Sequence, residues 1–538
     1  MLGIDSPKLA PTDLIRAILQ APVDLVWNGG IGTYVKASSE THADVDDRAN
    51  DAVRVDGRDL RCTVVGEGGN LGLTQRGRIE YAHAGGRINT DAIDNSAGVD
   101  CSDHEVNLKI LLAIACERGD LAREGRDQVL EDVVDDVVRL VLYDNYLQVQ
   151  ILSQEEAISP RRMEAYEDLM VELESHGLLE RQLEALPSGE LMAERIAAGH
   201  GMTRPELCVL LAYAKRLLRE QVIESSLPDD PYLGAALAEY FPPLVVERFG
   251  HLLPYHPLRR EIIATLVTND VINSMGITFV PRMSAETGAT PEEVARAFLV
   301  ARDVSRARDP WDAVERLDAV VPGDIQATLM DNVDSLVEQL ARWYLQNVHD
   351  IDLTAEVERG QPAFAELVQT LTDSATDAWR VATDGRLEEL LEQDVPAEPA
   401  RFGAVAPALV YAPDIMAVAQ ATGRSIPAVT RAFFTIGERL YLDLIEARAA
   451  ALPAADRWQR MAWDTLLDDL RLLRRQIVER VIAESRNGSI DDAVDAYLST
   501  RSDPYDRLSR MMENVTTAPP DDSSMVMVAV HQIRQVAS

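Results

Sequence analysis

Short apolar runs that end in glycine- or asparagine-containing turns recur in the first 100 residues of the chain. The runs with their turns are Val23–Trp27 with Asn28–Gly30, Cys62–Val65 with Gly66–Asn70, and Arg87–Thr90 leading toward Asp94–Gly98. An apolar run followed by a tight turn, with helical stretches between the repeats, predicts parallel strands of an α/β sheet. In such a sheet ligands bind beyond the carboxyl ends of the strands, which is where these turns fall.

The pattern changes to helical spacing after Ser102 and keeps it to about Arg510. Val106, Ile110 and Ile114 repeat on one face, and amphipathic segments separated by Pro, Gly or Asp breaks follow. The clearest predicted helices are Gln128–Leu152, Pro205–Glu224, Leu258–Met275, Ile325–Asn347 and Trp458–Glu484. The predicted fold class is therefore mainly α, with a partial α/β unit and a short parallel sheet at the N-terminus, followed by a large all-α domain of roughly 400 residues.

The helical region also contains an internal echo at a constant offset of 135 residues. The matched positions are Thr287, Gly288, Val294, Arg296, Ala297 and Phe298 in the first copy and Thr422, Gly423, Val429, Arg431, Ala432 and Phe433 in the second. Coincidence in an Ala-, Arg- and Leu-rich chain and duplication of a helical unit both account for it. Duplication predicts that the helices beginning near Pro291 and Pro427 superpose together with the long helices that follow them.

The predicted domain boundaries follow from these changes of pattern. They are 1–118 for the α/β unit, 119–280 for the first helical part, 281–515 for the helical part with the echo and 516–538 for a tail.

Charge and cysteine content narrow the choice of partners and compartment. The chain has 89 Asp and Glu against 52 Lys and Arg, a formal charge of −37, which disfavours nucleic acid and anionic membranes as partners. The four cysteines, Cys62, Cys101, Cys116 and Cys208, show no CxxC spacing, as is typical of a reduced cytoplasmic protein. We see no leader pattern at Met1 and no run of about 18 apolar residues, so a cytoplasmic location is expected.

Three blocks of the first domain carry a specific resemblance to a known family. They are Val23–Ser38 (VDLVWNGGIGTYVKAS), Val64–Tyr81 (VVGEGGNLGLTQRGRIEY) and Gly85–Ile110 (GGRINTDAIDNSAGVDCSDHEVNLKI). In this order and spacing they resemble the nucleotide-binding domain of the large-subunit class of bacterial NAD-specific glutamate dehydrogenases. The resemblance implies the C-terminal half of a Rossmann-like NAD-binding domain, in an enzyme that converts L-glutamate, NAD and water to 2-oxoglutarate, ammonia and NADH.

The resemblance also implies roles for individual residues. The implied cofactor-binding residues are Asn28, Gly29, Gly30, Glu67, Gly68, Gly69, Asn70 and Asn95. Glu67–Asn70 is similar to the EGAN turn of the smaller glutamate dehydrogenases, and Asn95–Val99 with Ser102 is similar to their NAGGV segment and the serine after it. By that likeness Asn70 bonds the cofactor ribose, Asn95 approaches the nicotinamide carboxamide, and Ser102 donates to the side-chain carboxylate of glutamate.

Elementary chemistry leaves two interpretations of these turns open. A turn without Cβ atoms lets backbone N–H groups approach a ligand, and asparagine offers both a donor and an acceptor. Ser102 is predicted to open a helix, where its hydroxyl and the free N–H groups would face an anion. The alternatives are that Asn28–Gly30 is only a tight strand-to-helix turn and that Ser102 is only an N-cap, with Glu105 completing a capping box.

The sequence lacks parts that catalysis requires. No GxGxxG occurs, and the resemblance places that turn, with the family's catalytic lysine and aspartate, upstream of Met1. We therefore predict no catalytic residue in this chain and no activity from it alone. The rival hypothesis is a helical scaffold or oligomerisation module with a vestigial nucleotide-binding unit. A third is an NAD-linked enzyme with another substrate. The full-length enzyme is expected to be a homo-oligomer.

Ordinary structural roles are expected for two lysines and one histidine near these blocks. The chain has only four lysines. Lys36 is expected to be a solvated surface lysine, with anion binding as the alternative, and Lys109 to pair with Glu105 at i, i+4. His104 lies beside Asp103 and Glu105, but adjacent helical residues point in different directions, so no metal site is expected there.

The first strand is expected to lie at an edge. Val23–Trp27 is a near-continuous apolar run, typical of a strand covered on both faces inside a parallel sheet. If the domain is a second half, the inner neighbour of this strand is missing. We therefore expect a parallel sheet of Val23–Trp27, Thr63–Val65 and Ile88–Thr90, with the first strand at an exposed or intermolecularly paired edge.

Overall fold

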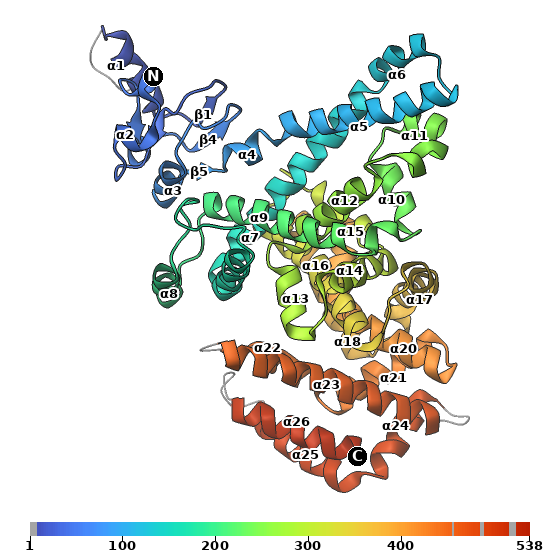
Figure 1. Cartoon of the computed structure of the whole chain (residues 1–538). Helices are drawn as coiled ribbons and strands as arrows, with labels where there is room; N and C mark the ends of the chain where they lie inside the picture. The colour runs from blue at the N-terminus through green and yellow to red at the C-terminus, as the bar shows by residue number, and fades with distance from the viewer. Residues whose placement is uncertain (1–7, 454–456, 485–488, 516–522) are drawn as a thin grey trace. The chain divides into compact units, whose positions relative to one another are not determined.

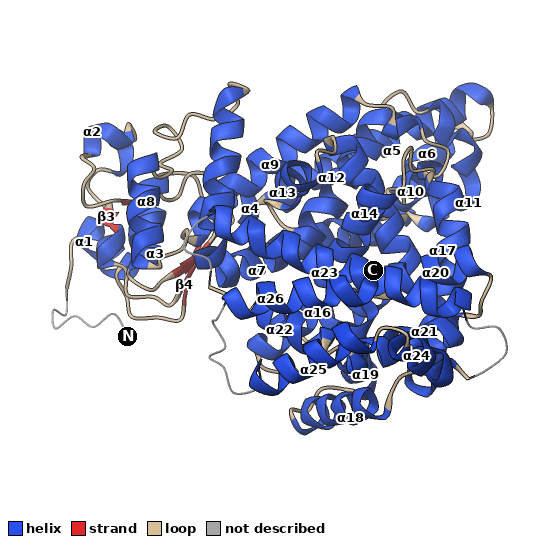
Figure 2. Ribbon diagram, turned by 90° about the horizontal axis from the view of Figure 1, so that it is seen from below, coloured by secondary structure: helices blue, strands red, loops and turns tan. Residues whose placement is uncertain are grey.

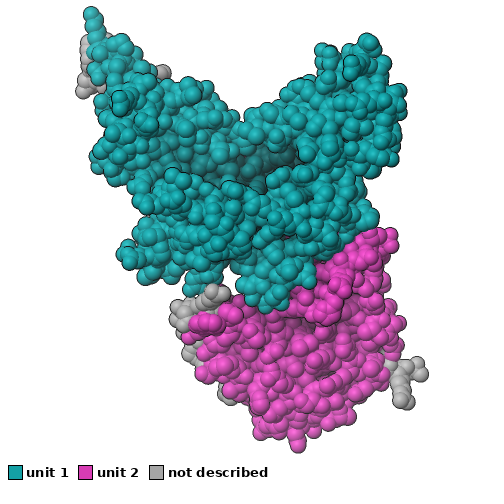
Figure 3. All heavy atoms as spheres, in the orientation of Figure 1, with its two compact units in different colours: residues 1–296 teal, residues 297–538 magenta. Residues whose placement is uncertain are grey.

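The computed structural model describes residues 8–453, 457–484, 489–515 and 523–538. The chain divides into two compact units, Met1–Arg296 and Ala297–Ser538, which Figure 3 shows in different colours. Helices hold 75% of the residues and strands only 3%, which confirms the mainly α fold class with a small parallel sheet. The finer boundaries proposed for the helical region stay predictions, and 516–522 of the predicted tail lie outside the described residues.

The N-terminal sheet has three parallel strands in the order β1-β4-β5 (Figure 1). Their bounds are β1 Leu25–Asn28, β4 Val64–Glu67 and β5 Arg87–Ile88. Leu25 pairs with Val64 and Asn28 with Glu67, while Val65 pairs with Ile88. This confirms the predicted sheet, and it brings the carboxyl ends of all three strands to one edge.

Strand β1 is an edge strand among the described residues, as predicted. The expected cover on both faces is wrong, because the side chains of alternate residues point to solvent: Leu25 is 53% exposed and Trp27 is 61% exposed. The helix before it, α1 (Pro11–Leu19), has no buried residue, and its Leu14 and Ile18 are also exposed.

A second sheet was not predicted. Strands β2 (Val35–Lys36) and β3 (Val55–Asp56) form a parallel pair of two residues each. They share one apolar core with the main sheet and with α3 (Gln75–His83), whose N-terminus is capped by the Thr74 hydroxyl. The buried members of this core are Val35, Val55, Leu60, Cys62, Val65, Leu73, Tyr81 and Ile88.

Helices make up the rest of the first unit (Figure 2). Their bounds are α2 His42–Val45, α4 Asp91–Asp94, α5 Ser96–Arg118, α6 Arg126–Asp132, α7 Val134–Ser175, α8 Gly189–Ala198, α9 Arg204–Glu224, α10 Leu233–Glu239, α11 Pro243–Phe249, α12 Arg259–Met275 and α13 Phe279–Thr287. Helix α14, Pro291–Ser305, begins in this unit and ends in the second. The predicted helices at Pro205–Glu224 and Leu258–Met275 are confirmed, and Gln128–Leu152 is divided between α6 and the 42-residue α7.

The start of helix α9 is hydrogen-bonded to residues next to the sheet. The Arg204 guanidinium at its start donates to Asn89 Oδ1 after β5 at 2.6 Å and to the Val149 carbonyl of α7 at 3.0 Å. Gln75 of α3 donates to the Pro205 carbonyl at 3.0 Å. These side chains fix the position of the sheet relative to the helices of the same unit.

The second unit is all helical in its described residues. Its further helices are α15 Arg308–Glu315, α16 Gly323–Asn347, α17 Leu353–Ser374, α18 Asp377–Glu392, α19 Ala397–Leu409, α20 Ala412–Thr422, α21 Ile426–Arg439, α22 Leu442–Ala450, α23 Arg457–Glu484, α24 Ile490–Ser499, α25 Ser502–Val515 and α26 Ser523–Ala537. The predicted helices Ile325–Asn347 and Trp458–Glu484 are confirmed as α16 and α23. No single described helix is long and apolar enough to cross a membrane. Among the described residues, two bent helix pairs, α12 with α13 and α19 with α20, reach that length and apolar character only when the two helices of each pair are taken as one segment.

Arg474 is a fully buried cation in the core of the second unit. The Arg474 guanidinium of α23 donates to Asp443 Oδ1 at 2.7 Å and to the Phe433 carbonyl, and it lies 4.5 Å from the centre of the Tyr411 ring. The backbone of α21 approaches it so closely that a Cβ at Gly437 would lie 2.1 Å from an Arg474 nitrogen. An ion pair with ring contacts therefore replaces apolar packing at this point.

The two copies of the internal echo have matching local geometry. Helices α13 and α20 both end at a glycine in the left-handed region, Gly288 with φ +75° and Gly423 with φ +65°. In both, the preceding threonine donates to the carbonyl four residues earlier, Thr287 to Met283 at 2.6 Å and Thr422 to Val418 at 2.7 Å. The helices that follow have lengths of 15, 8 and 25 residues in one copy and 14, 9 and 28 in the other. Superposition of the two copies stays a prediction.

Candidate nucleotide-binding site

Two of the predicted turns are in direct contact at the carboxyl ends of β1 and β4. The Gly69 N–H donates to the Asn28 carbonyl at 2.9 Å. A Cβ at Gly69 would lie 2.6 Å from the Gly30 carbonyl oxygen, and one at Gly68 would lie 2.4 Å from the Trp27 ring. These glycines are therefore required for the close approach of one turn to the other, which is the packing role that the tight-turn alternative anticipates.

The third predicted block reaches the same edge of the sheet. The Asn95 amide donates to Asn70 Oδ1 at 2.7 Å, and both residues retain exposed surface. One residue earlier, the Asp94 carboxylate accepts the Glu67 N–H at 2.9 Å. The structure thus brings together asparagines from all three sequence blocks: Asn28 and Asn70 through the contacting turns, and Asn95 through its amide.

One polar group at this edge is buried without a partner. The Asn28 side-chain nitrogen makes no hydrogen bond to any described residue, although it is inaccessible to solvent. An unpaired buried donor of this kind costs about 1–3 kcal/mol unless something accepts from it. The nitrogen packs against Gly72 inside the turn region, so the predicted contact of Asn28 with a cofactor stays a prediction.

Glu67 supports the turn from inside the sheet. Its carboxylate is fully buried and accepts from Arg78 Nε at 2.6 Å, from Arg78 Nη2 at 3.0 Å and from the Leu73 N–H at 3.1 Å. Burial raises the pKa of Glu67, while the hydrogen bonds from Arg78 act in the opposite direction. Both carboxylate oxygens are thus occupied by donors of the protein, and the predicted role of Glu67 in cofactor binding stays a prediction. Arg78 and Asp94 lie within the second and third sequence blocks, but no role was predicted for them, because their contacts with Glu67 join positions 11 and 27 residues apart.

Ser102 does not open its helix. Helix α5 begins at Ser96, six residues earlier, with Asn95 as its N-cap, so the predicted capping box with Glu105 is wrong. The junction is fixed from α7, where the Asn145 amide donates to the Ile93 carbonyl at 2.9 Å and to Ser96 Oγ at 2.8 Å. The Ser102 hydroxyl is exposed and donates to the Gly98 carbonyl at 3.2 Å. It is accessible to a substrate, and its contact with glutamate stays a prediction.

The lysines near these blocks are engaged elsewhere. Lys36 is buried in β2 with its ammonium 2.5 Å from Asp56 Oδ1, so the expected solvated surface lysine is wrong, because β3 covers it. Lys109 pairs with Glu105 at i, i+4, as predicted. Both lysines are held by carboxylates of their own surroundings and stand outside the predicted site.

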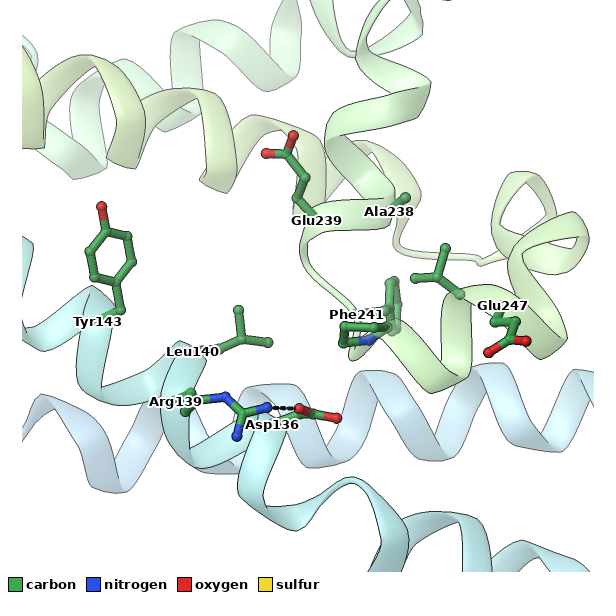
Figure 4. A pocket seen from close by; sticks show the side chains of 10 residues that line it. Asp136, Arg139, Leu140, Tyr143, Ala238, Glu239, Phe241 and Glu247 are labelled. Carbon is green, nitrogen blue, oxygen red and sulfur yellow. Dashed lines mark hydrogen bonds and ion pairs between the residues drawn. The ribbon is translucent and has the colours of Figure 1, made fainter. Parts of the chain in front are cut away.

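A separate groove lies between α7 and the α10–α11 segment (Figure 4). It has a volume of about 790 Å³, and its walls are largely apolar, with Leu140, Tyr143 and Phe241 among them. Arg139 and Asp136 pair with each other on the α7 side. None of the predicted cofactor residues lines this groove, so it is distinct from the strand ends.

Fold and site together define a class: a small parallel α/β unit with ligand-type turns at its carboxyl edge, followed by a large helical domain. Two family models match, one described as bacterial NAD-glutamate dehydrogenase, catalytic domain, over residues 1–155, and one as glutamate dehydrogenase, C-terminal, over residues 199–535. The chain belongs to the family of bacterial NAD-specific glutamate dehydrogenases.

Curated relatives agree along the whole chain. It is 41% identical to a protein named NAD-specific glutamate dehydrogenase from Pseudomonas aeruginosa over 99% of its own length. The identities to proteins of the same name from Halomonas elongata and Mycobacterium tuberculosis are 40% and 35%, over 100% of the chain. In each comparison the chain spans 33% of the relative, about a third of its length.

Proposed function

We propose that residues 1–118 form half of the cofactor site of an NAD-specific glutamate dehydrogenase, whose full-length form oxidises L-glutamate to 2-oxoglutarate and ammonia. The observation that carries the proposal is the hydrogen bond between Asn70 and Asn95, which joins two predicted cofactor residues at the carboxyl edge of the sheet. The names of the relatives support the choice of NAD and of glutamate.

In this proposal the chain binds and orients the cofactor and the substrate, and NAD, when bound, accepts the hydride. The Asn28–Gly30 turn lines the nicotinamide-ribose side, and Asn70 bonds the ribose. Asn95 holds the carboxamide and so fixes which face of the ring meets the substrate. Ser102, on the exposed face of α5, donates to the distal carboxylate of glutamate. The remaining groups needed for proton transfer are proposed to belong to the rest of the enzyme.

Binding of NAD to the isolated chain tests the proposal. Trp27 is exposed beside the Gly68 turn, so its fluorescence reports on the site, and a Trp27→Phe variant identifies its share of the signal. We expect measurable NAD affinity that falls about tenfold in Asn70→Ala, the effect of one lost hydrogen bond. Asn347→Ala, an exposed asparagine of the second unit, is the matched control and should bind as the wild type does.

The rival function, a helical scaffold with a vestigial nucleotide site, makes the opposite prediction. It requires no NAD binding in the chain or in the full-length enzyme, with an oligomeric state that depends on the helical region. We propose a cytoplasmic homo-oligomer for the full-length enzyme, which sedimentation and cell fractionation of that enzyme would test.

A further inference from the structure

Three side chains with metal-binding chemistry meet where α5 packs on α7. Asp100 and His104 stand four residues apart on α5, and Asp144 comes from α7. One ligand atom from each lies within 4.8 Å of the others, and His104 Nε2 is 3.9 Å from Asp100 Oδ1. Residues at i and i+4 share a helix face, and a third ligand from a facing helix completes the arrangement common in helix-bundle metal sites.

The cluster contains polar atoms that no described residue satisfies. His104 is only 2% exposed, yet neither of its ring nitrogens has a hydrogen-bond partner, and the same holds for Asp100 Oδ2. The ring is fixed in place by stacking on Tyr240, with 4.2 Å between the centroids, and the Tyr240 hydroxyl accepts from the Asn107 amide at 2.9 Å. Each unpaired buried polar group costs about 1–3 kcal/mol, so a rigid histidine in this state requires an explanation.

Contacts with the neighbouring charged groups do not explain why the His104 nitrogens are unpaired. The carboxyl groups of Asp100 and Asp144 share a hydrogen bond, and Lys215 of α9 lies close enough to act on both electrostatically, without an ion pair to either. A proton shared by the two carboxyl groups satisfies those groups alone. It leaves both His104 nitrogens unpartnered, whereas a cation between the three side chains accepts a lone pair from one of these nitrogens and from each carboxylate.

We propose that Asp100, His104 and Asp144 bind one divalent transition-metal cation and thereby brace α5 against α7. Imidazole nitrogen and carboxylate oxygen are both zinc ligands, three of them leave a fourth tetrahedral position open, and imidazole favours such ions over Mg²⁺ and Ca²⁺. The sequence-based expectation of no metal at His104 considered only Asp103 and Glu105. Both of those are exposed, and the actual neighbours are one helical turn and one helix away.

Titration of the metal-free 538-residue chain with Co²⁺ tests the proposal, because this ion substitutes for zinc and reports its ligands by visible absorption. We expect one equivalent to bind, with the spectrum of nitrogen and oxygen ligands and no sulfur-to-cobalt charge-transfer band. His104→Gln and Asp144→Asn should each weaken binding by roughly 100-fold or more. Asp103→Asn is the matched control, since it removes a charge beside His104 from an exposed position, and Cys101→Ser removes the nearest exposed thiol. Both controls should bind as the wild type does.

The unfolding temperature provides a second measurement, which separates loss of metal binding from loss of folding. Co²⁺ should raise the unfolding temperature of the wild type and of the Asp103→Asn variant, but not that of His104→Gln. If His104→Gln does not fold, Asp144→Asn and Asp100→Asn decide the question. Absence of binding by the folded wild type overturns the proposal. Binding that survives loss of His104 or Asp144, or that is lost only in Cys101→Ser, also overturns it.

Discussion

Arg78 donates two hydrogen bonds to Glu67, from Nε at 2.6 Å and from Nη2 at 3.0 Å. Glu67 ends β4 and directly precedes the turn that carries Asn70. The Arg78 side chain is 5% exposed and the Glu67 side chain 0%, so removing one partner leaves an uncompensated buried charge. We predict that Arg78→Met lowers the free energy of unfolding of the first unit by about 3–5 kcal/mol. Arg76→Met, an exposed arginine on the same helix, should change it by less than about 0.5 kcal/mol. Denaturant unfolding of both variants, followed by circular dichroism, measures the difference.

Glutamate oxidation by the 538-residue chain alone is predicted to be undetectable. No GxGxxG is present, and Lys36 and Lys109 are paired with Asp56 and Glu105. Reduction of NAD, followed by absorbance at saturating glutamate, measures this, with a full-length relative as the positive control. Turnover above background that disappears in Ser102→Ala would show that the chain has a complete active site.

Gly276 cannot carry a side chain. Its φ is +89° with ψ 173°, and a Cβ there would lie 2.3 Å from Oε1 of the buried Glu155, which also accepts the Ile277 N–H at 2.5 Å. We predict that Gly276→Ala lowers the free energy of unfolding by about 3 kcal/mol, through strain and the displaced carboxylate. Gly288→Ala is the control, since its φ of +75° is unfavourable but its surroundings are open, and about 1–2 kcal/mol is expected. Equal effects at the two positions would mean that the contact with Glu155 is unimportant.

The stability of the second unit should depend on pH through Asp491. Hydrogen bonds from Arg431, at 2.8 and 3.0 Å, lower the pKa of Asp491 below its usual value. A group with a lowered pKa stabilises the fold above its unfolded pKa of about 4 and loses that effect as pH falls through the lower folded value. Both side chains are partly exposed, so the effect is below about 1 kcal/mol.

The comparison with Asp491→Asn isolates this contribution. The difference in unfolding temperature between the wild type and this variant should be largest above about pH 5 and should shrink toward pH 2. Asp492→Asn, which removes an exposed neighbouring carboxylate, is the control. A difference that grows on acidification would contradict the assignment.

Sequence patterns located the strands and the long helices because both signals are local. An apolar run with its turn sufficed for β1 and β4, and the helical repeat placed α16 and α23 to within about two residues of their ends. The turn residues Asn28, Asn70 and Asn95 were brought together as expected, since the carboxyl ends of parallel strands meet at one edge.

The features that the sequence did not predict depend on contacts between residues far apart in the chain. Lys36 follows a glycine turn like a surface residue, and its burial depends on β3, whose Asp56 pairs with it from 20 positions later, and on α3, whose Gly77 packs against its backbone. Ser102 with Glu105 matches a helix start, but Asn145 fixes the start at Ser96 from a different helix. Arg474 in α23 resembles any charged residue of an amphipathic helix, and its burial follows from Asp443 and the surrounding rings.

The bare outer edge of β1 has a consequence for amide hydrogen exchange. On the side that faces β4 the chain is paired, as in the bond of 2.9 Å from the Val64 N–H to the carbonyl of Asp24 just before β1, whereas the outward groups of β1 have no strand partner among the described residues. Amides of β4, which is paired on both sides, should therefore exchange only when the first unit opens, while the outward amides of Leu25–Asn28 exchange by local fluctuation. Deuterium uptake should thus differ between two adjacent strands of one sheet. Any segment that pairs with β1 in the full-length enzyme would be detected by the protection it gives to these few amides.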